Sequence, residues 1–297
     1  VPCRAALWWQ RAIYFLHGPY WMMKASFMTT SPPPIDGCVP ATSDDSFLSG
    51  AISLRQPCDG YRVGTDAVML AATINPPNNS QKKEPRMLDM GAGVGGVCLA
   101  VRTRLLRGHI TAIEKDAFCA ELLAYNIAQN NLSTAIRPVA GDITNMPAML
   151  RASFDAVFAN PPFHHASDKN PRFRRRSLAH NGDGETSLSD WVRAGLWALR
   201  DKGRLSFIVR ADRTDEVMIA LRDGGAGEIL LYPLWSYATS PAVRMVITAR
   251  KGVKGAMALL PGLVLHRPSG ALTPATQKVM KGEGIILTHP AAQHIKP

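Results

Sequence analysis

The sequence predicts a mixed α/β fold: a mostly parallel sheet with helices on both faces and an antiparallel hairpin at one edge. From residue 85, apolar runs of strand length alternate with apolar residues at helical spacing. A glycine-rich loop joins the first of these strands to a helix. After Gly227, two strand-like runs follow each other across a short connection, which indicates the edge hairpin.

Each element follows from its own stretch of sequence. Strands are expected where apolar residues form short runs, at 87–89, 109–114, 135–140, 154–159 and 204–209. Helices are expected where apolar residues recur at helical spacing, at 67–72, 94–106, 117–130, 188–199 and 216–221. The hairpin strands are expected at 228–234 and 242–249. Ligands of such sheets bind beyond the carboxyl ends of the strands, so residues at those ends are candidates for a site.

The chain divides into three parts by composition. Aromatic side chains crowd into residues 1–40, which end near three consecutive prolines at 32–34. We expect 1–45 to be an amino-terminal extension, disordered or upstream of the true start; an amphipathic helix capping the domain is the alternative. Residues 46–250 are the expected catalytic domain. Residues 251–297, rich in Gly and Pro, are expected to pack on it as a carboxyl-terminal extension.

Charge and cysteine content narrow the class of protein. The 34 Lys and Arg residues outnumber 23 Asp and Glu, for a net charge of +11. This excess favours a polyanionic partner, most simply nucleic acid, although a soluble basic protein has the same composition. The five cysteines lack metal-ligand spacing, and no apolar stretch is long enough to span a bilayer. We therefore expect a cytoplasmic protein without disulfides, a metal or membrane contact, and leave its oligomeric state open.

The most informative motif begins at Asn160, where an apolar strand ends in Asn-Pro-Pro-Phe. Proline cannot donate to a strand ladder, so the strand stops there. The Asn160 side-chain oxygen and the backbone carbonyls of Asn160 and Pro161 can accept both hydrogens of a planar amino group, and the Phe163 ring can stack on its plane. We interpret Asn160, Pro161 and Phe163 as catalytic, Asn160 also as a cofactor contact, and Pro162 and Phe163 as substrate contacts. The alternative is an ordinary strand-terminating turn.

The glycine-rich loop lets a ligand approach the backbone closely, and its candidate cofactor contacts are Gly91, Gly93 and Gly95. With Glu114 about 20 residues on, the loop also satisfies a dinucleotide fingerprint, so a nicotinamide dehydrogenase stays open. Acidic residues at three strand ends favour a cationic ligand instead: Asp89, Glu114 and Asp142. We expect S-adenosylmethionine, which carries a sulfonium, an ammonium, a ribose diol and an adenine amine. Each acid taken singly has an alternative role as a helix cap or turn residue.

A second string, Tyr-Arg-Val-Gly-Thr-Asp at 61–66, precedes the expected helix at 67–72. Thr65 or Asp66 could simply cap that helix. The functional interpretation is a lid over the methionine end of the cofactor, with Arg62, Gly64, Thr65 and Asp66 as contacts.

Together these motifs resemble the small-domain S-adenosylmethionine-dependent methyltransferases. The span from residue 47 to 252 is similar to the bacterial tRNA-valine adenine 6-amino methyltransferases. The similarity rests on the strings at 47–50, 61–66, 89–95 and 160–163 and on Glu114, Asn126, Asn130 and Asp142, and the string at 261–265 also resembles the closing segment of that family. The resemblance implies a seven-stranded Rossmann-like methyltransferase fold and methylation of an exocyclic amino group of an RNA base, most simply adenine in tRNA. His164 keeps ribosomal-RNA guanine 2-amino methyltransferases as an alternative. Glutamine methyltransferases acting on release factors, which have Tyr where this chain has Phe163, rank third.

The expected chemistry is positioning plus electrostatics, without a covalent intermediate. The acceptors at Asn160 and Pro161 hold the amine hydrogens so that the nitrogen lone pair faces the methyl group. The target base must be unstacked, and Phe163 offers a stacking surface. His164 and the basic run after it are expected to contact RNA, through Lys169, Arg172, Arg174, Arg175 and Arg176. A solvated loop with no specific role is the alternative for this run.

Overall fold

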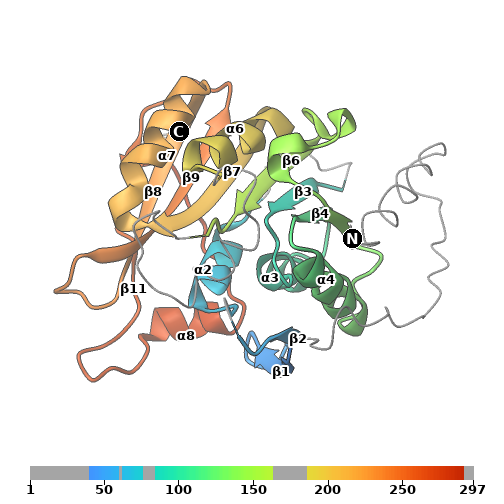
Figure 1. The fold of residues 1–297 in the computed structure, drawn as a ribbon. Helices are drawn as coiled ribbons and strands as arrows, with labels where there is room; N and C mark the ends of the chain where they lie inside the picture. The colour runs from blue at the N-terminus through green and yellow to red at the C-terminus, as the bar shows by residue number, and fades with distance from the viewer. Residues whose placement is uncertain (1–39, 60–61, 76–83, 163–185, 291–297) are drawn as a thin grey trace. The chain divides into compact units, whose positions relative to one another are not determined.

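The structure is a computed structural model, and it describes residues 40–59, 62–75, 84–162 and 186–290 (Figure 1). The predictions for residues 1–39, for Phe163 and His164, and for the basic run at 169–176 lie outside the described residues. The described residues from Pro40 onward belong to one compact unit. The predicted divisions after residues 45 and 250 stay predictions.

The predicted mostly parallel sheet is confirmed. In spatial order its strands are β10-β8-β9-β7-β6-β3-β4-β5, with β11 also beside β8. Among the described strands of this sheet, only β9 runs antiparallel to its neighbours. The seven long strands are those predicted: β3 (Arg86–Met90), β4 (His109–Glu114), β5 (Ile136–Ala140), β6 (Phe154–Ala159), β7 (Leu199–Arg210), β8 (Ala226–Trp235) and β9 (Ala242–Lys251). Two short strands, β10 (Ala258–Leu259) and β11 (Leu263–Val264), extend it beyond β8.

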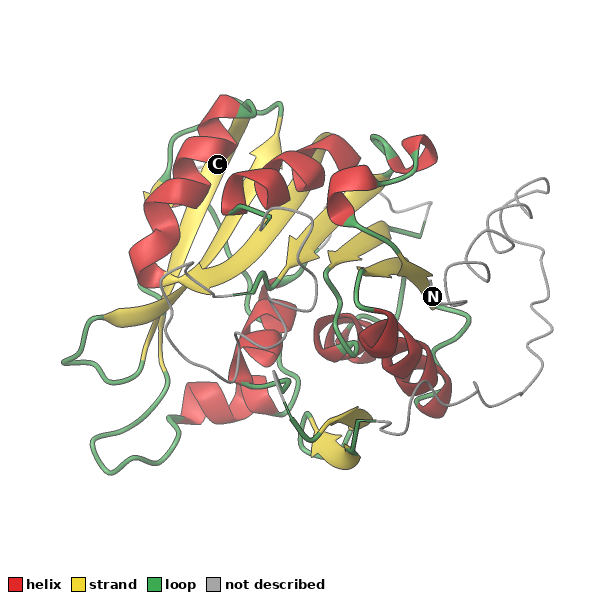
Figure 2. Ribbon diagram, viewed as in Figure 1, coloured by secondary structure: helices red, strands yellow, loops and turns green. Residues whose placement is uncertain are grey.

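Each face of the sheet carries its own apolar core, because successive residues of a strand point to opposite faces. Met87 and Phe158 belong to one core, while their neighbours Leu88 and Val157 belong to the other. The first core is completed by α2 (Thr65–Thr73), α3 (Gly96–Arg104), α4 (Ala117–Gln129) and α8 (Pro274–Met280). The second is completed by α6 (Leu188–Ala198), α7 (Thr214–Asp223) and the 3₁₀ turns η1 (Ile143–Asn145) and η2 (Ala148–Leu150). Figure 2 shows α6 and α7 side by side over the long strands.

Two strands and one helix were not predicted. Strands β1 (Thr42–Phe47) and β2 (Ile52–Pro57) form a separate antiparallel hairpin. The sequence of β1 is mostly polar and gives no strand pattern, but the alternation of buried Ile52 and Leu54 in β2 is a signal that could have found it. Helix α8 is only seven residues long, although it has a Thr273 cap and Pro274 at its first position.

None of the helices in the described ranges is long and apolar enough to cross a bilayer.

Candidate active site at the carboxyl edge of the sheet

The strand register brings three of the predicted site residues into one row. Met90 pairs with Ile113 of β4 on one side and with Ala159 of β6 on the other. The residues that follow them, Gly91, Glu114 and Asn160, are therefore neighbours at the carboxyl edge. With strands about 4.8 Å apart, Glu114 and Asn160 flank Gly91 across roughly 10 Å of edge.

The glycine loop turns sharply, and its glycines have different tasks. Gly91, Gly93 and Gly95 have φ values of 64°, 55° and 101°, a region that favours glycine. A Cβ on Gly91 would lie 2.4 Å from the ring of Trp191 on α6, so Gly91 is needed for packing. A Cβ on Gly93 would have no heavy atom within 4 Å. The loop thus presents the Gly93 backbone to open space, where a ligand can reach it.

Asp89 lies inside the molecule, beneath this loop. It is 1% exposed, and one carboxylate oxygen accepts a hydrogen bond from the Cys98 N–H at 3.0 Å. Cys98 stands in the first turn of α3, so Asp89 caps that helix from a neighbouring strand. Burial raises the pKa of Asp89 from 3.8 to about 8, even though the hydrogen bond from Cys98 works the other way.

Glu114 lies at the end of β4 and holds the glycine loop through hydrogen bonds. Its carboxylate accepts hydrogen bonds from the Gly93 N–H at 2.7 Å and from the Asp116 N–H at 2.8 Å. Burial raises the pKa of Glu114, and these backbone hydrogen bonds offset the rise only in part. A cationic ligand beside Gly93 would therefore meet a desolvated, already oriented carboxylate.

Asp142, two residues past β5, caps the turn η1. One oxygen accepts from the Thr144 N–H and hydroxyl, both at 2.8 Å, and the other pairs with Lys115 at 2.8 Å. Burial works to raise the pKa of Asp142, but the contacts with Lys115 and Thr144 outweigh it and lower the pKa. The capping role considered for single acids is thus present at Asp89 and Asp142, while their role toward a ligand stays a prediction.

The 62–66 segment is held by the hairpin and by β9. The Arg62 guanidinium donates to the Ser43 hydroxyl, the Pro57 carbonyl and the Asp45 carboxylate. The capping alternative for Thr65 and Asp66 is wrong, because α2 begins after Gly64 without a side-chain cap. Asp66 instead forms an ion pair with Arg244 of β9 at 2.8 Å. The cofactor role predicted for this segment stays a prediction.

Asn160 follows a strand in which every residue is buried. It is half-buried, and it is followed by a buried Pro161 and an exposed Pro162. The chain therefore leaves the core at Asn160, beside Gly91. Phe163 lies outside the described residues, so the stacking role predicted for it stays a prediction.

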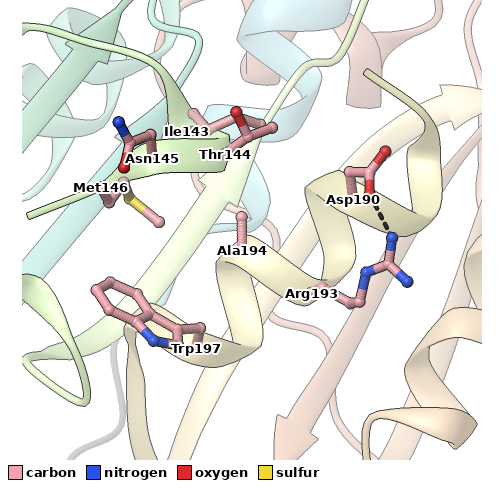
Figure 3. A pocket seen from close by; sticks show the side chains of 8 residues that line it. All are labelled: Ile143, Thr144, Asn145, Met146, Asp190, Arg193, Ala194 and Trp197. Carbon is pink, nitrogen blue, oxygen red and sulfur yellow. Dashed lines mark hydrogen bonds and ion pairs between the residues drawn. The ribbon is translucent and has the colours of Figure 1, made fainter. Parts of the chain in front are cut away.

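A pocket of about 370 Å³ lies between η1 and α6 (Figure 3). Trp197, Ala194 and Met146 give it apolar walls, and the Asp190–Arg193 ion pair lies at one end. Its lining contains none of the predicted site residues, although Ile143 follows Asp142 directly. Its volume is in the range of small-molecule sites.

The residues at the edge fit a cationic cofactor. Open space over Gly93 gives a ligand access to the loop backbone, and the raised pKa values of Asp89 and Glu114 report carboxylates that lack compensating positive charge. No group of three or more His, Cys, Asp or Glu that could hold a metal occurs within the described part of the chain.

Comparison with known proteins agrees with this geometry. The family model described as the methyltransferase small domain matches residues 64–212, half of the chain. The chain belongs to the methyltransferase small domain family. The matched residues run from Gly64 through the glycine loop and Asn160 to the turn after β7.

Curated relatives of this methyltransferase domain include two bacterial proteins named tRNA1(Val) (adenine(37)-N6)-methyltransferase. The protein of Aliivibrio salmonicida is 28% identical over 151 residues, and that of Shewanella sp. (strain W3-18-1) is 32% identical over 155 residues. In both cases the match covers 50% of this chain and 60% of the relative, so the chain spans about 60% of the length of the curated relatives it matches.

A crystal structure described as a predicted O-methyltransferase from Agrobacterium tumefaciens superposes with a TM-score of 0.59. It is 24% identical, and the match covers 74% of this chain and 97% of that one. This likeness confirms the Rossmann-like methyltransferase fold and carries nothing about the substrate.

The sequence missed the residues that support the site from other elements. Trp191 is visible in sequence only as part of an amphipathic helix, and its contact with Gly91 depends on how α6 crosses the sheet. Arg244 gave no signal at all, because it is 178 residues from its partner Asp66.

Proposed function

We propose that this protein transfers a methyl group from S-adenosylmethionine to an exocyclic amino group of an RNA base, adenine in tRNA being the first candidate. The observation that carries the proposal is the row formed by Glu114, Gly91 and Asn160 on three neighbouring strands. A carboxylate and a glycine loop suited to a cationic cofactor thus stand next to an amide suited to an amino group.

The chain's own residues supply binding and orientation. Glu114 and the Gly93 backbone would hold the cofactor, and Asp89 would fix the loop from beneath. When bound there, S-adenosylmethionine would supply an electrophilic methyl group to the amine nitrogen, and the surplus amine proton would leave to water. Asn160 and the Pro161 carbonyl accept the two amine hydrogens and thereby turn the nitrogen lone pair toward the methyl group. Partial positive charge developing on the amine is stabilised by the same acceptors.

An RNA substrate is supported by three further observations. The net charge of +11 favours a polyanion, and arginines stand at the carboxyl edge beyond Asn160, at the end of β7 and the start of β9: Arg210 and Arg244. The curated relatives carry names that specify adenine of a tRNA. The alternatives of guanine and of protein glutamine become outcomes of the test.

The test is methylation of undermodified total RNA, and in a parallel reaction of a release factor, with radiolabelled S-adenosylmethionine, followed by identification of the labelled nucleoside or protein by mass. We expect 6-methyladenosine in tRNA. Label recovered on guanine or on a release factor would replace the proposed substrate, and no label on any acceptor would contradict the proposal.

The residue to change is Asn160. Asn160→Ala should reduce methyl transfer by about a thousandfold or more, since removing one preorganised transition-state contact costs 10²–10³ and the second hydrogen also loses its orientation. Cofactor affinity, measured by calorimetry, should stay within about threefold of wild type, because in the proposed mechanism the Asn160 amide acts mainly on the amine. Asn145→Ala, an exposed asparagine in the pocket of Figure 3, is the matched control. Full turnover by Asn160→Ala would remove this residue from the mechanism.

A further inference from the structure

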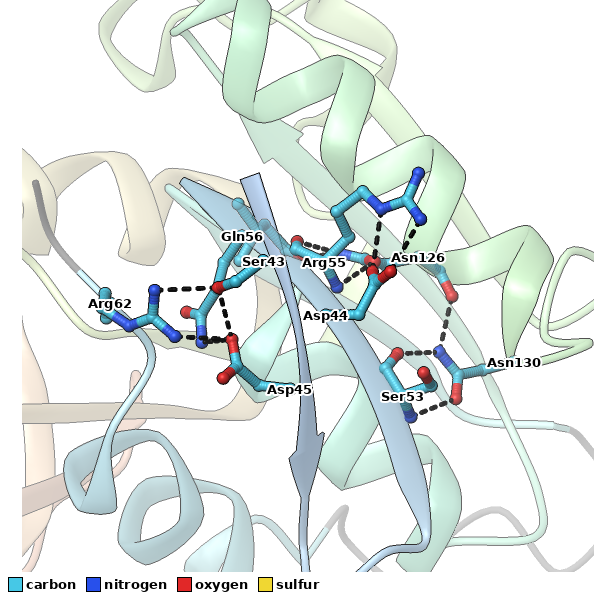
Figure 4. Close-up of polar contacts among 10 residues, drawn as sticks. Ser43, Asp44, Asp45, Ser53, Arg55, Gln56, Arg62, Asn126 and Asn130 are labelled. Carbon is cyan, nitrogen blue, oxygen red and sulfur yellow. Dashed lines mark hydrogen bonds and ion pairs between the residues drawn. The ribbon is translucent and has the colours of Figure 1, made fainter. Parts of the chain in front are cut away.

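Asn126 of α4 and Asn130, the residue that follows this helix, bind the free edge of the β1–β2 hairpin (Figure 4). The Asn126 side chain accepts from the Arg55 N–H at 2.8 Å and donates to the Arg55 carbonyl at 2.8 Å. Asn130 does the same with Ser53, at 3.0 and 2.7 Å. Each amide side chain therefore pairs with one residue of β2 as a neighbouring strand would.

This pairing requires the spacing of the outward-pointing backbone groups of β2 to match the spacing of the side chains on one face of the helix. Ser53 and Arg55 are two residues apart, so their backbone groups point to the same edge, about 6.8 Å from each other. Asn126 and Asn130 are four residues apart, so they lie on one face of the helix, about 6 Å from each other. The amides thus satisfy an edge of β2 that would otherwise be left unpaired.

Asn126 differs from Asn130 in one contact. Its second amide hydrogen is donated to the carbonyl of Val94 at 2.9 Å, and Val94 belongs to the glycine loop. Asn126 is fully buried, at 0% exposure, so these hydrogen bonds are shielded from water. Asn130 donates its second amide hydrogen to the backbone carbonyl of Asn126 at 2.7 Å.

The hairpin also carries the next segment to the same loop. The Gln56 side chain, on β2, accepts from the Val63 N–H at 2.9 Å. Val63 in turn lies against Gly96, where an added Cβ would be 2.4 Å from a Val63 methyl group. The hairpin therefore contacts the glycine loop at Val94, and the 62–66 segment contacts the start of α3 at Gly96.

We propose that Asn126 is a positioning residue for cofactor binding: through the Val94 carbonyl it ties the glycine loop to the β1–β2 hairpin. The inference rests on the proposed function, because it assigns the cofactor to that loop. Asn130 anchors the hairpin without contacting the loop and serves as the internal comparison.

The test measures S-adenosylmethionine affinity by calorimetry for the full chain and for Asn126→Ala and Asn130→Ala. Each variant loses two hydrogen bonds to β2, and only Asn126→Ala also loses the bond to Val94. We expect Asn126→Ala to weaken cofactor binding about tenfold, the equivalent of one buried hydrogen bond, and Asn130→Ala to stay within about threefold. RNA affinity should be unchanged in both.

Two further measurements keep the inference open to refutation if Asn126→Ala fails to fold. Asn126→Asp retains the oxygen that accepts from Arg55 but loses both donors, and it should show a similar loss of cofactor affinity. In the wild-type protein, added S-adenosylmethionine should slow hydrogen exchange at the Arg55 amide more than at the Ser53 amide.

Equal weakening by the Asn126→Ala and Asn130→Ala variants, or equal protection of the two amides, would overturn the role of Asn126 and leave the proposed function intact. A wild-type protein that binds no S-adenosylmethionine would overturn both.

Discussion

The two halves of the sheet's carboxyl edge hold their charges in different ways. On the β3–β4–β5 half, each acid accepts backbone N–H groups, and two of the three have raised pKa values: Asp89 and Glu114. On the β7–β9 half, Arg210 and Arg244 pair with side-chain carboxylates. Backbone partners fix a charged group in place, whereas a side-chain partner can be exchanged.

This difference matches two kinds of ligand. A small cofactor gains from carboxylates that are already desolvated and oriented, since little reorganisation is left when it binds. A long polyanion needs cations that can change partner. The exposed Arg210–Asp212 pair contributes only about 0–1 kcal/mol, so Arg210 can leave its carboxylate for a phosphate at small cost, whereas the half-buried Arg244–Asp66 pair is harder to open. We therefore propose that the cofactor binds at the β3–β4–β5 half of the edge and RNA at the β7–β9 half.

The largest effect is expected on the acidic half, for Glu114→Gln. A hydrogen bond to a charged group contributes about 1.5–3 kcal/mol, so cofactor affinity should fall about 10- to 150-fold. Asp116→Asn is the matched control: it removes a carboxylate two residues away and keeps a good cap for α4. Calorimetry measures both, and equal affinities would show that the charge at the end of β4 is not used.

A smaller effect concerns Asp89 and pH. Because its pKa rises from 3.8 to about 8 on folding, the folded chain binds a proton more tightly than the unfolded chain between those values. The stability contributed by Asp89 is therefore fully present below pH 4 and lost as the pH rises to about 8, with a slope of at most about 1.4 kcal/mol per pH unit.

Asp89→Asn keeps an oxygen for the Cys98 N–H but cannot titrate. Its free energy of unfolding, measured by urea titration from pH 5 to 9, should lack this part of the decline. Parallel curves for the two proteins would mean that Asp89 is ionised throughout the range.

The sequence was sufficient to locate the glycine loop and Glu114 on the acidic half, but not to locate the residues that support them. The glycine loop and Glu114 could be found because each lies at the end of an apolar strand whose limits the residues define; β4 and β6 lie where they were predicted. Neighbouring parallel strands then bring their ends together without further information.

The supports of the site could not be predicted, since they depend on tertiary packing. The β1–β2 hairpin obtains its outer-edge hydrogen bonds from Asn126 and Asn130, more than 70 residues away, and β1 is mostly polar and has no strand pattern of its own. Asn126 and Asn130 are ordinary helical residues in sequence, and the match between helical and strand spacing becomes visible only when the helix lies along β2.

The smallest effect is expected on the basic half, for Arg244→Gln. If Arg244 exchanges Asp66 for one phosphate, its loss should weaken RNA binding at most about fivefold. The slope of log affinity against log salt should also become shallower by about 0.7, the contribution of one phosphate on a single strand. Cofactor affinity should be unchanged, in contrast to the loss expected for the Glu114 variant.

The matched control is Arg222→Gln. Arg222 is exposed in the last turn of α7 and thus lies toward the opposite edge, so its loss removes the same charge and should leave the salt slope unaltered. Equal slopes for the two variants would show that only net charge attracts RNA, and that the β7–β9 half of the edge is not where it binds.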